Sequence, residues 1–142
     1  MKITNNFTLE ELCYSLVADK KGIENYPNAQ QKEAIEALAK NVLQPIRDFI
    51  GVPLHINSCF RSEKLNKLIS KVPTSYHLAT RGIAAADISC QRVELKVIFK
   101  YIKENLDFHE LIWEYGNSEN PKWIHVAFNS SGKNNKKIIY VK

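Results

Sequence analysis

The order of the predicted elements indicates an α+β fold, in which N-terminal helices pack on a mainly antiparallel sheet. Apolar residues at helical spacing dominate residues 8–51, and three strand-like segments with no helix between them fill residues 110–141. The chain has 142 residues, a length that suits a single domain spanning 1–142. Hydrophobic residues make up 44% of the chain, which is enough for one ordinary core.

A first helix is expected from about residue 8 to residue 19. Thr8 and Glu11 form a capping-box pattern, in which each side chain satisfies a free amide at the start of a helix. Gly22 follows the segment and is expected to end the helix, because glycine adopts the left-handed conformation common at this point.

A second helix is expected to follow the turn at 25–28. Its apolar residues recur every three or four positions, so they share one face and pack in the core. Pro45 falls inside this stripe and is expected to kink or restart the helix, and Gly51 is expected to close it. The stripe consists of Ile35, Leu38, Val42, Ile46 and Phe49.

Short strands and helices alternate in the rest of the chain. Residues 70–83 contain Pro73 and Gly82 and are expected to form a loop. Turns at 117–121 and 129–135 are expected to join the last three strands one after another. The expected strands are 54–57, 84–89, 110–115, 123–128 and 138–141, and the expected helices are 62–69, capped by Ser62, and 93–104.

Composition narrows the classes of partner. The formal net charge is +5, but the lysines are scattered and no helix-turn-helix or finger motif is present, so we expect no nucleic-acid partner. No stretch approaches the roughly 18 apolar residues of a membrane span, so no stable membrane association is expected. Residues 1–6 lack the apolar run of a secretory signal, so synthesis in the cytoplasm is expected. We also expect the protein to be a monomer.

Two of the four histidines lie in settings that suit a metal ligand. His77 precedes a strand of small residues that carries Asp87, and His125 lies on an alternating strand. Two imidazoles and a carboxylate form a normal catalytic zinc site, whose open fourth position holds a water of lowered pKa. A histidine on a strand is more often a hydrogen-bonded core residue, so the spacing alone leaves both interpretations open. The cysteines include no CxxC pair, which excludes a thiolate zinc knuckle.

Four ordered motifs resemble the zinc D-alanyl-D-alanine carboxypeptidase family, metallopeptidase family fifteen. The segments Phe7–Glu11 and Val42–Arg47 are also similar to its short phage-type and prophage-type members, so the resemblance covers nearly the whole chain. The four motifs are Asn57-Ser-Cys-Phe-Arg61-Ser62, Ser75-Tyr-His77, Ala85-Ala-Asp87-Ile88 and Trp123-Ile-His125-Val.

The resemblance implies a site and an activity. One zinc ion would be held by His77, Asp87 and His125, on the fold shared by the Hedgehog domain and these DD-peptidases. The activity would be hydrolysis of peptide bonds in peptidoglycan stem peptides. The matching arginine, Arg61, would bind carboxylate or carbonyl groups of the substrate, for which a guanidinium offers a planar fork of donors. Ser75 would lie near the substrate.

The spacing between two of these motifs departs from the family pattern. Three residues, Ala-Thr-Arg, stand as an insertion before Gly82, between His77 and Asp87. A loop absorbs such an insertion at little cost, because closure entropy grows slowly with length. We expect the insertion to lie beside the metal, where it would be able to reshape the pocket.

Glu114 is the candidate general base. Several relatives carry an acidic residue three positions before the last histidine, but this chain has Lys122 there. Relatives with a similar strand, including the Hedgehog signalling domain, carry a glutamate at the position of Glu114. If the strands 110–115 and 123–128 pair with Glu114 opposite Trp123, Glu114 and His125 share a face of the sheet.

Two alternatives remain to the peptidase interpretation. One is a non-catalytic binding module that keeps the fold and the zinc, since fold does not imply function. The other is a small basic nucleic-acid-binding protein, which rests on the net charge alone. Within the peptidase interpretation, carboxypeptidase and endopeptidase action both stay open, and a phage-type lysin would act on the cell wall.

Overall fold

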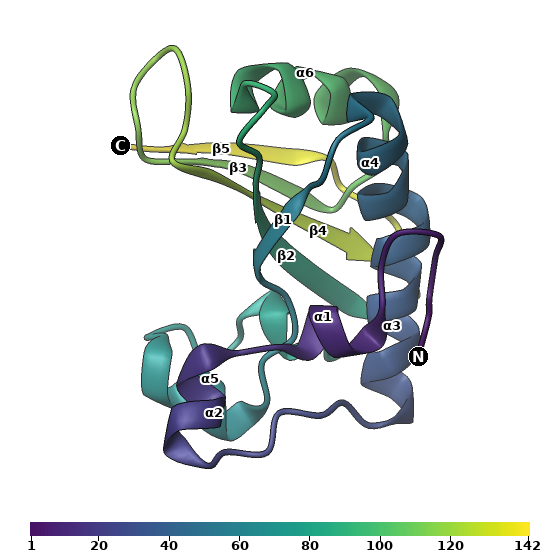
Figure 1. The fold of residues 1–142 in the computed structure, drawn as a ribbon, viewed down its shortest axis with the longest axis vertical. Coiled ribbons are helices and arrows are strands. Elements are labelled where there is room, and N and C mark those ends of the chain that lie inside the picture. The colour runs from purple at the N-terminus through teal and green to yellow at the C-terminus, as the bar shows by residue number, and fades with distance from the viewer.

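The computed structural model describes all 142 residues and has helices packed on one five-stranded sheet, as predicted (Figure 1). The strands lie in the order β1-β2-β4-β3-β5, and every neighbouring pair except β3–β5 is antiparallel. None of the helices has the length and hydropathy that crossing a membrane requires. The strands are β1 (His55–Ser58), β2 (Ile83–Ser89), β3 (Glu110–Glu114), β4 (Trp123–Asn129) and β5 (Lys137–Val141).

The last strand, β5, does not pair with β4, although the expected turn at 129–135 would have placed the two side by side. β5 pairs with β3 in parallel, from Glu110 opposite Lys137 to Glu114 opposite Val141. It does not follow β4 as a hairpin, because β4 is already paired on both edges, with β2 and β3. The chain after β4 therefore crosses to the remaining free edge of β3.

One long helical stretch packs beside the sheet, at the right in Figure 1. α3 (Ala29–Leu38) continues through the π-helical turn η1 (Ala39–Leu43) into α4 (Gln44–Ile50). Pro45 lies in the first turn of α4, as the predicted restart requires. Pro45 has no backbone N–H to donate to a carbonyl of the preceding turn. The wider π-helical turn directly before α4 accommodates the missing hydrogen bond. Gly51 ends α4 with φ 68°, also as predicted.

The core lies between this helical stretch, α6 (Leu95–Asn105) and one face of the sheet. Alternate residues of each central strand point into it. Ala86 of β2 and Val126 of β4 are fully buried there, while their neighbours Asp87 and His125 point to the other face. The core strand residues are Ala84, Ala86, Ile88, Leu111, Ile124 and Val126.

The first predicted helix is divided in two. α1 (Leu9–Cys13) and α2 (Leu16–Lys21) are separated at Tyr14, whose backbone is extended, and the hydroxyl of Ser15 caps α2. The carbonyls at the end of α1 have tertiary partners: Phe60 N–H donates to Leu12, and the Asn25 side chain donates to Cys13. These contacts from distant residues replace the helical hydrogen bonds that the local sequence favoured.

The predicted loop at 70–83 contains a short helix that matters for the site. α5 (Glu63–Ile69) ends just before this loop, and the Ser62 hydroxyl caps the start of α5, as predicted. The 3-10 helix η2 (Tyr76–Leu78) then forms a single turn within the loop. Its chain lies along the face of the sheet opposite the long helices and brings His77 to that face.

Candidate metal centre and active site

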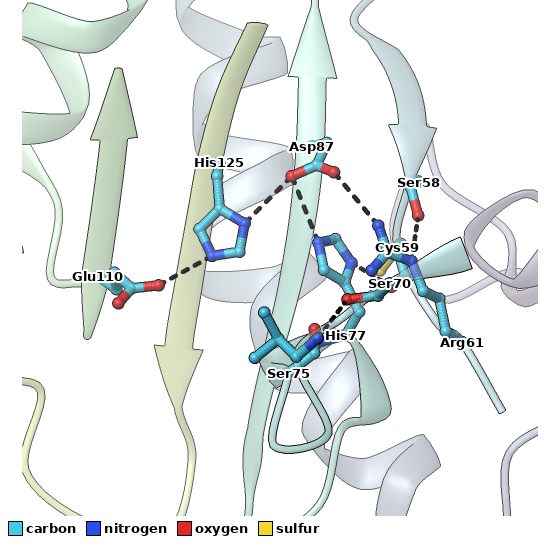
Figure 2. A network of polar contacts seen from close by, with 10 residues as sticks. Ser58, Cys59, Arg61, Ser70, Ser75, His77, Asp87, Glu110 and His125 are labelled. Carbon is cyan, nitrogen blue, oxygen red and sulfur yellow. Dashed lines mark hydrogen bonds and ion pairs between the residues drawn. The ribbon is translucent and has the colours of Figure 1, made fainter. Parts of the chain in front are cut away.

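Strand register brings two of the predicted ligands together. Asp87 of β2 lies directly opposite His125 of β4, on the sheet face that points away from the core helices. η2 supplies His77, whose ring centroid lies 5.3 Å from that of His125. All three side chains converge on one point, with the Asp87 carboxylate between the two imidazoles (Figure 2).

Backbone contacts set the orientation of His77. The Ser75 hydroxyl accepts from the N–H of His77, and Arg61 N–H donates to the His77 carbonyl at 2.8 Å. Nδ1 of His77 donates to the carbonyl of Cys59 at 2.7 Å. The opposite ring nitrogen, Nε2, is therefore unprotonated in the neutral ring and faces Asp87 Oδ1 at 3.3 Å.

His125 is held by carboxylates on both ring nitrogens. Nδ1 lies 3.1 Å from Asp87 Oδ1, and Nε2 lies 3.0 Å from Oε1 of Glu110 (Figure 2). Such a carboxylate partner commonly orients a histidine that binds a metal through its other nitrogen. Sequence analysis missed Glu110, although its place four residues before Glu114 on an alternating strand puts both glutamates on one face.

The spacing of the ligand atoms suits a tetrahedral metal. Oδ1 of Asp87 lies 3.3 Å from His77 Nε2 and 3.1 Å from His125 Nδ1, and one ligand atom from each residue lies within 4.8 Å of the others. Zinc bonds of about 2.0–2.1 Å give a tetrahedron whose edges are about 3.3 Å. The three residues thus fit a zinc-sized ion and leave a fourth position free.

Charge interactions and burial shift the pKa of each of the three ligands. Burial opposes ionisation of the Asp87 carboxyl, but contacts with both imidazoles hold its pKa well below the ordinary range. Burial lowers the pKa of His77 and so favours its neutral, metal-binding form. Burial also opposes charge on His125, yet Asp87 and Glu110 raise its pKa to about 9.

A cavity of about 610 Å³ opens over the three ligands, a size typical of a small-ligand site. Glu114 lines it, and Glu114 lies opposite Trp123 in the β3–β4 ladder, which is the register required for Glu114 and His125 to share a face. Burial raises the pKa of Glu114, with further contributions from the charges of Asp87 and Glu110. Glu114 is therefore a carboxylate with a raised pKa on the same face as His125.

Arg61 and Ser75 line the same cavity. Arg61 Nη2 lies 3.7 Å from Asp87 Oδ2, and Nε donates to the Ser58 hydroxyl at 3.3 Å. The Arg61 side chain is 15% exposed, so this contact is not an ordinary surface ion pair. Ser75 has a structural task as well, because its hydroxyl caps η2.

The three-residue insertion lies elsewhere than expected. None of its residues lines the metal cavity, and the expectation that it lies beside the metal was wrong. Ala79 and Arg81 adopt left-handed backbone conformations that turn the chain away. The loop after β4 then holds the turn, with Ser131 Oγ donating to the Arg81 carbonyl and Ser130 N–H donating to that of Gly82.

Comparison with known proteins agrees with this geometry. The family described as Peptidase M15 matches residues 5–127, which is most of the chain and includes all three candidate ligands. The protein belongs to the Peptidase M15 family, and its class is that of a metallopeptidase. No match was found among curated proteins.

The raised pKa of His125 predicts that metal binding depends on pH. A ligand imidazole must be neutral, so metal uptake displaces the proton that His125 holds below a pH of about 9. Apparent zinc affinity should therefore rise by up to about tenfold per pH unit between neutral pH and pH 9. Zinc titration against a competing chelator at pH 7 and pH 8, corrected for the chelator's own protonation, measures this rise, and a flat profile would contradict it.

Proposed function

We propose that this protein is a zinc metallopeptidase that hydrolyses peptide bonds in peptidoglycan stem peptides. The observation that carries the proposal is the convergence of His77, Asp87 and His125 at tetrahedral spacing beneath a cavity lined by Glu114. A metal ion bound there would lower the pKa of a coordinated water and polarise the scissile carbonyl. The resemblance to peptidoglycan peptidases supports the choice of substrate.

Glu114 is the proposed general base. A base in this role takes a proton from the attacking water and passes it to the leaving amine, and its pKa is best placed near the working pH. Burial moves the pKa of Glu114 in that direction. Glu110, by contrast, has a lowered pKa and contacts His125 directly, so its proposed task is to orient that ligand.

Arg61 and Ser75 are the proposed substrate-binding residues. Ser58 and Asp87 hold the Arg61 guanidinium, which lines the cavity. Its remaining N–H groups would donate to a carboxylate or carbonyl of the stem peptide. Ser75 lines the cavity beside His77 and would orient the substrate backbone.

Mass spectrometry of digested peptidoglycan tests the function directly. We expect the zinc-loaded protein to release new stem-peptide fragments, a chelator to abolish their release, and added zinc to restore it. Loss of a single alanine from the stem identifies a carboxypeptidase, and separation of cross-linked stems identifies an endopeptidase. A protein that binds one zinc ion yet cleaves no stem peptide would instead be a binding module.

A further inference from the structure

A second cavity of about 670 Å³ lies at the ends of β3 and β5, next to the metal cavity. Three aromatic side chains form its walls, and we refer to Trp113, Tyr115 and Tyr140 as the aromatic shelf. Tyr115 also lines the metal cavity, so one side chain forms part of both walls. The remaining walls come from Gly116, Asn117, Ser118, Val141 and Lys142.

The shelf exposes aromatic surface, although Trp113 and Tyr140 also pack on the buried ring of Phe99 at the edge of the core. Tyr140 is 56% exposed and Tyr115 is 45% exposed. Trp113 lies 5.9 Å from Tyr140 between ring centroids, and its Nε1–H donates to the carbonyl of Asn117 at 3.1 Å. Because this hydrogen bond holds the indole edge, the shelf is a preformed surface, as is usual for a ligand site.

The backbone at Tyr115 adopts a left-handed conformation in the tight turn that follows β3. Tyr115 has φ 58°, a conformation that non-glycine residues rarely adopt. Its N–H donates to the carbonyl of Val141, and a Cβ on the next residue, Gly116, would lie 2.2 Å from the carbonyl oxygen of Asn120. A tight turn thus holds a large exposed aromatic between two cavities, and strain of this kind is concentrated at functional sites.

We propose that the aromatic shelf binds a sugar ring of the glycan strand that carries the stem peptide. A pyranose has an apolar C–H face, which packs on an aromatic ring, and a polar rim of hydroxyl and N-acetyl groups. The shelf offers the matching surface: flat rings flanked by the amide of Asn117 and the hydroxyl of Ser118. This inference rests on the proposed function, because the stem peptide in the metal cavity brings its own sugar with it.

The chemistry of the shelf favours this neutral ligand over a charged one. Lys142 contributes the one charged side chain among its lining residues, and none of these residues is an aspartate or a glutamate. The position of the second cavity also favours a sugar ring as the ligand, because both cavities share Tyr115. The ring centroid of Tyr115 lies 5.4 Å from that of Trp123, which lines the metal cavity. A glycan strand and its attached peptide would therefore occupy neighbouring surfaces at the same time.

Saccharide binding tests the shelf without any need for catalysis. Zinc-loaded protein is titrated with N-acetylglucosamine tetrasaccharide and with peptide-free glycan strands, with tryptophan fluorescence and amide NMR shifts as readouts. We expect saturable binding, weakened about five- to tenfold by Tyr140→Ala, since one stacking contact is lost. Phe49→Ala is the matched control: Phe49 is 50% exposed, stacks on Tyr101 and lines neither cavity.

Absence of binding to either saccharide would contradict the proposed sugar site. Equal saccharide affinities of Tyr140→Ala and Phe49→Ala would contradict it as well. Cleavage gives a second, separate readout, the ratio of kcat/KM for glycan-attached stems to that for free stem peptide. Tyr140→Ala should lower this ratio about five- to tenfold, and Phe49→Ala should leave it unchanged. If no variant cleaves any stem, the proposed peptidase fails and the saccharide titration alone decides the shelf.

Discussion

Replacement of Glu114 by glutamine is expected to lower kcat on stem peptides by about 10²–10⁴-fold, the usual contribution of general acid–base catalysis. Glutamine keeps the size of the side chain but cannot accept a proton from water at neutral pH. Glu114 is not one of the three residues of the metal-ligand set, and it forms no ion pair with them. Zinc content should therefore stay at one ion per chain, and the loss should fall on kcat rather than on metal binding.

A pH profile adds a sharper test of the same role. The raised pKa of Glu114 means that the acidic side of the kcat/KM profile should lie above the ordinary range for a glutamate, with activity lost as the pH falls through it. This acidic limb should vanish from the residual activity of Glu114→Gln. Glu104→Gln, on the exposed side of α6, is the matched control and should behave like the unaltered protein. Full activity in a zinc-loaded Glu114→Gln protein would remove Glu114 from the mechanism.

Replacement of Asp87 by asparagine should have an equally large effect, but through loss of the metal. The Asp87 carboxylate lies between both imidazoles, and it is the one anionic group of the ligand set. An amide oxygen is a weaker zinc ligand than a carboxylate. We expect zinc affinity to fall by at least about 10²-fold, and activity at limiting zinc to fall with it. Zinc titration, followed by assays at limiting and at excess zinc, measures both effects.

Two further variants separate a direct ligand from its surroundings. Glu110→Gln removes the charge beside His125 Nε2 but keeps the size of the side chain that packs there, so zinc affinity should fall by about 10-fold rather than 100-fold. Asp107→Asn changes an exposed carboxylate just before β3 and should change nothing. Unchanged zinc affinity in Asp87→Asn would mean that the metal, if any, is bound elsewhere.

The parts of the fold that depend on local sequence were predictable. Capping at Ser62, the restart at Pro45 and the helix end at Gly51 follow from side-chain and backbone preferences within one turn. The strands were also placed to within one residue at each end, because the patterns that predict them are local. The pairing of β3 with β4 was also expected, but its register, with Glu114 opposite Trp123, was a condition that only the structure fulfils.

The features that sequence analysis missed depend on contacts between distant residues. The break at Tyr14 arises because Phe60 and Asn25 bind the carbonyls at the end of α1. β5 joins β3 because β4 has no free edge. The insertion before Gly82 faces away from the metal because the loop after β4 holds it there. None of these partners is near in sequence, so no local pattern contains them.

For the site, the amino-acid sequence determined which residue types were available and, through ordered motifs, that His77, Asp87 and His125 were the candidate ligands. Tertiary structure alone decided that the strand register and η2 bring their ligand atoms within 4.8 Å of one another. It also decided which ring nitrogen of each histidine faces Asp87. The Cys59 carbonyl contacts the other nitrogen of His77, and Glu110 contacts the other nitrogen of His125. The reason is physical: ligand geometry is a property of three side chains whose separation is set by sheet pairing, which a linear pattern does not record.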